Sequence, residues 1–270
     1  MNDPHVVSLT CRIDKAETVD FDKAPPLRVD RGAFRVTIDA YVAKIEVVDH
    51  FASVEEAKQI VQPFLRAWEL QADLQSSGDR FRFVYDTAEV IDRNPPAPGN
   101  TVMRAEVGRF DLTVMDAVLH VGRAKWPDPP QELEVSPDAD ALWRRWWRYR
   151  EEGRELLLSA AYWALTMLEA APGLAAPVKP RRSSKRRQTA SAFFNIDLDV
   201  LNMIGELTST RGGNDEERKA EGRATPLSPL ERHWLEAAFQ ALVRRVAEQA
   251  YRGGPPPRPL TMGDLPKLAP

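Results

Sequence analysis

The sequence predicts an α+β fold in which an N-terminal antiparallel sheet with one packed helix is followed by an all-α C-terminal domain. Apolar and polar residues alternate over most of the first 130 residues, and this pattern is interrupted once, by a stretch with helical periodicity. From residue 136 onward, apolar residues recur at helical spacing, and five of the seven tryptophans lie between Trp126 and Trp163. Residues 1–135 carry 16 Lys and Arg against 23 Asp and Glu, whereas residues 136–270 carry 21 against 17, which favours two domains.

Strands are expected at residues 5–13, 33–51 and 80–93, and one or two more at 101–123. In the second of these the alternation slips phase near Ala43, which indicates a β-bulge. Residues 14–32 are polar and turn-rich. Ser53 and Glu56 have the spacing of a capping box, and a helix of about 20 residues follows them. Pro63 lies inside this helix and should kink it. The pattern is typical of an antiparallel sheet crossed by one helix.

The proline-rich segment 126–137 is the expected boundary between a sheet domain at 1–130 and a helical domain at 136–252. Ser136 can cap the first helix, with Pro137 at its first position. Gly153 either breaks the helix or only weakens it, and the helical pattern resumes beyond it until Pro172.

Two more helices are expected in the second half of the chain. One spans 198–207 and is capped by Asn195 or Asp197; the other follows the capping box of Ser228 and Glu231 and ends near Tyr251. Residues 174–192 are expected to form a basic loop, and residues 253–270 a proline-rich tail that is disordered or wraps over the surface.

The tryptophans admit two interpretations. Their rings can stack on nucleic-acid bases, with the neighbouring arginines on phosphates, or they can fill a core against other helices. Because they fall on the same helical stripe as the leucines that follow, the spacing favours the core.

Composition excludes several classes of protein. The single cysteine, Cys11, rules out an internal disulfide or a cysteine-rich zinc site, and it lies in an expected strand. The N-terminus lacks the features of a signal peptide and no apolar stretch is long enough to span a membrane, so a cytoplasmic location is expected. The histidines, at 5, 50, 120 and 233, have no metal-ligand spacing; no metal and no cofactor is predicted.

A weak set of polar candidates lies at strand ends. Asp49 and His50 close the long expected strand just before a helix, where a hydrogen-bonded pair can act as a general base. The alternative is a pair that faces solvent or bonds to the next turn. Asp92 follows Glu89 in the strand at 80–93, but strand geometry sends these two carboxylates to opposite faces, which makes a poor acid/base dyad.

The basic run at 179–187 is the sharpest functional signal. Six of its nine residues are basic: Lys179, Arg181, Arg182, Lys185, Arg186 and Arg187. Such a run predicts salt-sensitive, sequence-independent contact with nucleic acid or an acidic protein. The alternative is a solvated loop between helices.

Several segments resemble a family of bacterial two-domain proteins with no assigned activity. They include FNIDLDVLNMIGELTST at 194–210 and PLSPLERHWLEAAFQALVRRVAE at 226–248, together with VIDRNPP at 90–96. The resemblance covers most of the chain and implies no catalytic residues. The order of sheet and helices is also similar to defence proteins of the HEPN type, but their spacing of Arg and His is absent around His233.

These observations favour a non-catalytic cytoplasmic binding or regulatory protein that contacts an anionic partner through the basic run. Two alternatives stay open: an enzyme acting on nucleic acid through the helical half, and a small-molecule enzyme with its site in the cleft between sheet and helix, involving Asp49, His50 or Asp92. Two of these polar groups within hydrogen-bond reach in a deep pocket would favour the last.

Overall fold

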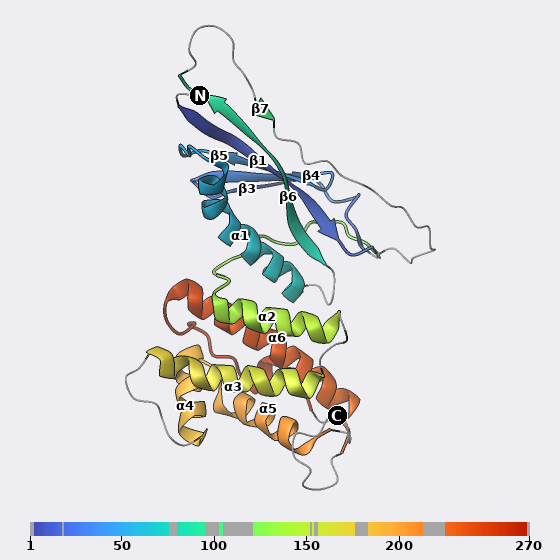
Figure 1. Cartoon of the computed structure of the whole chain (residues 1–270). Coiled ribbons are helices and arrows are strands. Elements are labelled where there is room, and N and C mark those ends of the chain that lie inside the picture. Colours follow the sequence, from blue (N-terminus) through green and yellow to red (C-terminus); the bar gives the residue numbers. More distant parts are fainter. Residues whose placement is uncertain are drawn as a thin grey trace. The chain divides into compact units, whose positions relative to one another are not determined.

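The computed structural model describes residues 3–17, 19–75, 80–94, 103–104, 121–151, 153, 156–175, 183–212 and 225–268. The chain forms two compact units, residues 1–131 and residues 132–270. The first contains an antiparallel sheet with helix α1, and the second contains helices α2 to α6, as the α+β prediction requires (Figure 1).

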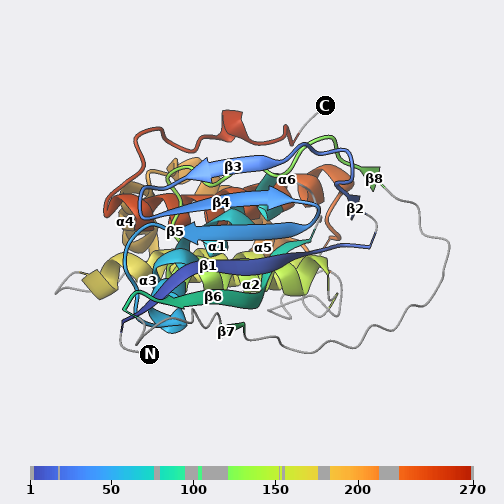
Figure 2. The ribbon, with the colours of Figure 1, turned by 90° about the horizontal axis from the view of Figure 1, so that it is seen from above.

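Among the described residues the sheet has six strands, in the order β3-β4-β5-β1-β6-β7 (Figure 2). They are β1 (Pro4–Lys15), β3 (Leu27–Asp30), β4 (Phe34–Asp39), β5 (Val42–Val47), β6 (Phe81–Asp92) and β7 (Met103–Arg104). All five pairings between neighbours are antiparallel. A separate parallel pair joins β2 (Val19–Asp20) to β8 (Val121–Gly122). Most of the expected strand at 101–123 lies outside the described residues.

The phase slip near Ala43 marks a hairpin, so the predicted β-bulge is wrong. Strands β4 and β5 pair in register through Asp39 and Val42, and the two-residue turn between them consists of Ala40 and Tyr41. Both have positive φ, 46° and 63°, as a type I′ turn requires. This turn normally carries Asn-Gly, so Ala-Tyr gives no hairpin signal in the sequence.

Helix α1 (Val54–Gln75) covers one face of the sheet (Figure 1). Its buried side chains, which include Val61 and Trp68, pack against inward-facing residues of β1, β4 and β5. Cys11 belongs to this core, and burial raises the pKa of its thiol to about 11, so the thiol is protonated and inert at neutral pH. The opposite face carries polar pairs such as Arg35 with Asp30 and Glu46, which is typical of an antiparallel sheet with one solvated face.

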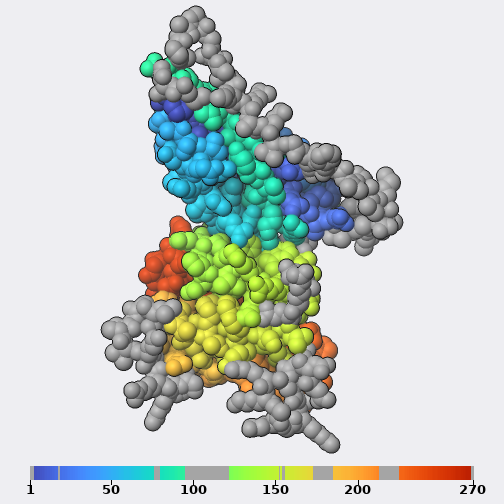
Figure 3. All heavy atoms as spheres, viewed as in Figure 1, coloured from blue at the N-terminus to red at the C-terminus, as the bar shows by residue number. Residues whose placement is uncertain are grey.

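The second unit contains α2 (Pro137–Arg150), α3 (Leu157–Ala175), α4 (Ser183–Phe194), α5 (Leu198–Thr210) and α6 (Pro229–Arg252). The predicted N-caps of α2 and α6 are confirmed: the hydroxyls of Ser136 and Ser228 accept backbone N–H groups, and Glu231 completes the capping box. Atoms of α2 and α3 lie side by side on the face seen in Figure 3. Trp143 and Trp146 are buried, as the core interpretation of the tryptophans predicts.

Two expectations for the second unit are corrected. The second half of the predicted loop at 174–192 is helix α4, because Ala190 and Phe194 are buried and anchor this polar segment to the other helices. Of the two alternatives for the tail, disorder is wrong for residues 253–268, whereas a segment that wraps over the surface agrees with their mostly exposed or half-buried residues. Leu260 forms a β-bridge with Ile196, its carbonyl accepts the N–H of Asp197 at 2.8 Å, and its side chain is buried.

Candidate functional site

Two of the three predicted polar candidates lie near each other at one end of the sheet. The His50 ring is placed between Asp3, whose Oδ1 is 3.5 Å from Nε2, and Arg93, whose Nη1 is 3.3 Å from Nδ1. Asp92 joins the same cluster by accepting the backbone N–H of Asp3 at 3.0 Å. Asp49 is exposed and is not brought to these groups by any contact among the described residues.

Sequence reasoning missed His5 as a member of this cluster. Its ring stacks on that of His50, with centroids 5.3 Å apart, and only 7% of the residue is exposed. Its Nδ1 has no hydrogen-bond partner among the described residues. Burial lowers the pKa of His5, the charges of Arg93 and His50 lower it further, and Asp3 opposes them. His5 is therefore a neutral, buried imidazole at neutral pH.

The His5 cluster makes stability depend on pH in a defined direction. Because the pKa of His5 is lower in the folded chain than its usual 6.5, the unfolded state binds the proton more tightly. Stability is therefore present above about pH 6.5 and is lost as the pH falls through the folded-state pKa. We expect wild type to lose up to about 1.4 kcal/mol per pH unit in this window, the limit for one proton. Urea unfolding between pH 7.5 and 5.5 measures this loss.

His5→Phe should lose less stability over that range and should be no less stable than wild type at pH 7.5, because it removes a buried nitrogen without a partner. His233→Phe, at an exposed site, is the matched control and should follow the wild-type profile. Parallel profiles for wild type and His5→Phe would contradict the assignment.

The basic run is only partly described. Lys179, Arg181 and Arg182 lie outside the described residues, whereas Lys185 and Arg186 are exposed in the first turn of α4. Arg187 is engaged within the unit: its Nε donates to Glu169 at 3.0 Å and its Nη1 to Asn202 at 3.1 Å. Nucleic-acid contact through the run stays a prediction. Within the unit, Arg187 takes part in a pair with Glu169 and Asn202.

A pocket in the first unit was not predicted. Its volume is about 560 Å³, and it is bordered by residues of the loop between β2 and β3, of α1, β6 and β8, and of the segment that follows β8. Buried aromatic residues contribute to its lining: Phe21 stacks on Trp126, with centroids 4.9 Å apart, and meets Phe81 edge-on at 6.2 Å. Exposed side chains at its border are Gln75, Arg123, Lys125 and Asp128. We refer to it as the Trp126 pocket.

Hydrogen bonds hold the aromatic wall of the Trp126 pocket in place. The indole N–H of Trp126 donates to the carbonyl of Pro25, and that of Trp68 to the carbonyl of Pro127, both at 3.0 Å. Gln75 and Asp128 are joined by two bonds of 3.2 Å. These contacts fix the chain on either side of Trp126, so the pocket is preformed.

The turn residue Tyr41 supports the same wall from behind. Its hydroxyl accepts the N–H of Phe21 at 2.8 Å and donates to Asp20 at 2.6 Å, and its ring meets Trp126 edge-on. Burial, reinforced by the Asp20 carboxylate, raises the pKa of the Tyr41 phenol. This phenol is therefore a structural hydrogen-bonding group at neutral pH.

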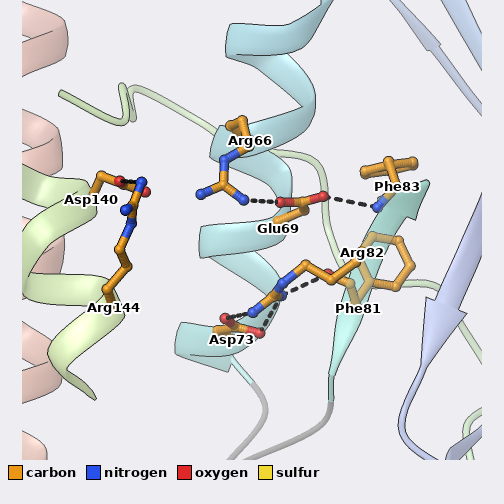
Figure 4. A network of polar contacts seen from close by, with 8 residues as sticks. All are labelled: Arg66, Glu69, Asp73, Phe81, Arg82, Phe83, Asp140 and Arg144. Atoms are coloured by element: carbon orange, nitrogen blue, oxygen red, sulfur yellow. Dashed lines mark hydrogen bonds and ion pairs between the residues drawn. The ribbon is translucent and has the colours of Figure 1, made fainter. Parts of the chain in front are cut away.

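An ionic network braces α1 against the start of β6 beside the pocket (Figure 4). Arg82 forms a two-bond pair with Asp73, at 3.0 and 2.8 Å. The Glu69 carboxylate accepts one hydrogen bond from the Arg66 guanidinium at 2.7 Å and another from the backbone N–H of Phe83 at 2.8 Å. Burial raises the pKa of Glu69, while these two donors act in the opposite direction. The network thus satisfies the backbone N–H of Phe83, and Arg82 also donates to the carbonyl of Phe81 at 2.8 Å.

Neither a metal site nor a membrane-spanning helix is found in the described part of the chain. Its His, Cys, Asp and Glu side chains form no group of three or more suited to a metal ion. None of its helices combines the length and apolar character needed to cross a bilayer.

Comparison with known proteins found no matching family model, no matching curated protein and no matching solved structure. The resemblance to a bacterial two-domain family therefore stays a prediction, and function has to be inferred from the geometry of the pockets.

Proposed function

We propose that the protein is a non-catalytic binding protein whose N-terminal unit takes a small ligand with a planar apolar body and an anionic group. The observation that carries this proposal is the Trp126 pocket, which combines a preformed aromatic wall with two basic residues at its border. Its volume of about 560 Å³ is within the range typical of ligand sites.

The anionic preference follows from the border residues. Arg123 and Lys125 are cationic, and Asp128, the one carboxylate among the described lining residues, lies 3.6 Å from Lys125. Both members of that pair are largely exposed, at 78% and 57%. An exposed pair of this kind is weak, so Lys125 can exchange Asp128 for a ligand anion at little cost.

The lining residues favour binding over catalysis. The described lining contains no histidine, cysteine, serine, threonine or tyrosine, so it lacks a nucleophile paired with a general base. The polar candidates Asp49, His50 and Asp92 do not line it either. The alternative of a small-molecule enzyme in the sheet–helix cleft thus has less support. A cytoplasmic location is part of the proposal, because the one cysteine is a free, buried thiol.

A fluorescent probe with the proposed chemistry tests the pocket. We expect 1-anilinonaphthalene-8-sulfonate to bind the folded chain saturably and more tightly than its uncharged analogue N-phenyl-1-naphthylamine. Gly122→Phe should weaken binding by about tenfold or more, because Gly122 lines the pocket and a Cβ there meets no atom within 4 Å; the added ring fills space that the ligand needs. Fluorescence titration gives the dissociation constants.

The charge contribution is tested by Arg123→Gln with Lys125→Gln, expected to weaken sulfonate binding about threefold to tenfold and to leave the neutral analogue unaffected. The matched control is Arg28→Gln with Lys44→Gln, two exposed residues of the same unit that do not line the pocket. Undiminished binding by Gly122→Phe would reject the site. If replacing Lys185 and Arg186 by serine abolishes sulfonate binding, the anion site lies in the basic run instead.

A further inference from the structure

The helical unit contains a second pocket of opposite electrostatic character. Its volume is about 340 Å³, and its described lining residues all belong to residues 132–270. They come from the start of α2, the ends of α3 and α4 and the last turns of α6. The residues that matter for its chemistry are Glu134, Asp138, Phe193, Gln249, Ala250 and Gly253. We refer to it as the Phe193 pocket.

Two carboxylates of the Phe193 pocket have no cationic partner among the described residues. Glu134 and Asp138 are exposed, and neither side chain forms an ion pair or hydrogen bond with the described residues. Two of the basic residues at this end of α6 are engaged elsewhere, Arg252 with Glu132 and Arg245 with Glu248 at 3.1 Å. The negative charge at the pocket is therefore not neutralised by these arginines.

The end of α6 adds to this negative potential. The helix finishes in a left-handed Gly253, whose N–H returns to the carbonyls of Gln249 and Ala250. The carbonyls of a last turn carry a partial negative charge, which favours cations. The N-terminus of α2 acts in the opposite direction, but Asp138 in its first turn offsets that contribution.

The aromatic part of the pocket suits a cation that carries an apolar stem. Phe193 is half-buried and meets the buried Phe194 edge-to-face, with ring centroids 4.9 Å apart. The face of a phenyl ring attracts alkylammonium and guanidinium groups, and its body packs against their methylene stems.

We propose that the Phe193 pocket binds an alkylammonium or alkylguanidinium group on a short apolar stem. The group is placed between the carboxylates of Glu134 and Asp138 and the end of α6, with its stem on Phe193. This site is separate from the Trp126 pocket, and neither inference depends on the other.

Saturation-transfer NMR on the full chain tests the site with four probes of one stem length: n-butylammonium, n-butylguanidinium, n-butanol and butyrate. We expect the two cations to bind with a dissociation constant of about 1 mM. The neutral and anionic probes should not bind. Binding should weaken as salt rises from about 20 to 200 mM, because both carboxylates are exposed to solvent.

Asp138→Asn and Glu134→Gln should each weaken cation binding about threefold to fivefold. Asp199→Asn is the matched control: it removes an exposed carboxylate from the first turn of α5 in the same unit and should leave binding unchanged. Ala250→Trp, a change on the half-buried face of α6, should block the pocket and abolish binding. Equal effects of Asp138→Asn and Asp199→Asn, or equal binding of butyrate and butylammonium, would overturn the proposal.

The same experiment separates two sources of the cation. A glycine-flanked trilysine peptide that binds at least tenfold more tightly than butylammonium identifies a lysine side chain of a protein partner. Equal affinity of the two identifies a free amine. Both outcomes support the site, provided that Asp138→Asn weakens the binding.

Discussion

Replacing Arg82 by alanine is expected to destabilise the first unit by about 3–5 kcal/mol, the range for removing one partner of a buried ion pair. The Asp73 carboxylate is 5% exposed and Arg82 is 18% exposed, so the pair is shielded from water. Without the guanidinium, Asp73 stays buried without its two-bond partner, or takes up a proton to avoid the charge. Urea unfolding at pH 7.5 measures the loss.

Two comparisons separate the buried charge from the loss of side-chain packing. Arg82→Met with Asp73→Leu removes both charges and should recover most of the lost stability, since well-packed apolar residues often replace buried pairs without cost. Arg12→Ala breaks the exposed pair with Asp86, at 3.6 Å, and should cost less than about 1 kcal/mol. If Arg82→Ala costs no more than Arg12→Ala, the network does not brace α1 against β6.

The sequence predicts the fold class well because both periodicities are clean. Alternation along β4 and β5 places residues such as Val36, Ile38 and Ile45 in the core, and the helical stripe of α6 runs from its capping box to Gly253. These are local patterns, set by which face of an element is buried.

Elements defined by distant partners were missed. The hairpin turn at Ala40 and Tyr41 has no turn residues, and it is held by contacts of the Tyr41 hydroxyl with Asp20 and Phe21. Strand β3 lies in a polar, turn-rich stretch and forms by pairing with β4. Helix α4 has little amphipathic pattern, so only its buried Ala190 and Phe194 explain why it folds against its neighbours.

The candidate sites show the same limit. His50 and Asp92 were singled out because they stand at strand ends, and the pairing of β1 with β6 then brings Asp3 and Arg93 to them. Nothing in the sequence links His5 to His50, which are 45 positions apart. The Trp126 and Phe193 pockets each combine residues from several separate segments, so single-sequence patterns cannot find them.

Replacing Trp146 by alanine is expected to cost about 3–5 kcal/mol, the range for a large buried aromatic side chain. Trp146 is 6% exposed, and its ring stacks on Phe239 of α6 with centroids 5.5 Å apart. The cost reflects the cavity left between α2 and α6, because alanine itself is the better helix former. A fall in melting temperature of about 10 °C or more follows from this loss and can be read by circular dichroism.

Trp163 provides the matched control for Trp146, because it is another tryptophan of the same unit that is only half-buried, with Arg145 over its ring at 4.4 Å. Trp163→Ala should lower the melting temperature by less than half as much, because the exposed part of the Trp163 side chain stays in contact with water and contributes nothing to packing. A Trp146→Ala chain that melts within a degree or two of wild type, yet loses binding of a ligand, would show that the tryptophans of α2 are a recognition surface. The stacked, buried position of Trp146 against α6 argues for the core.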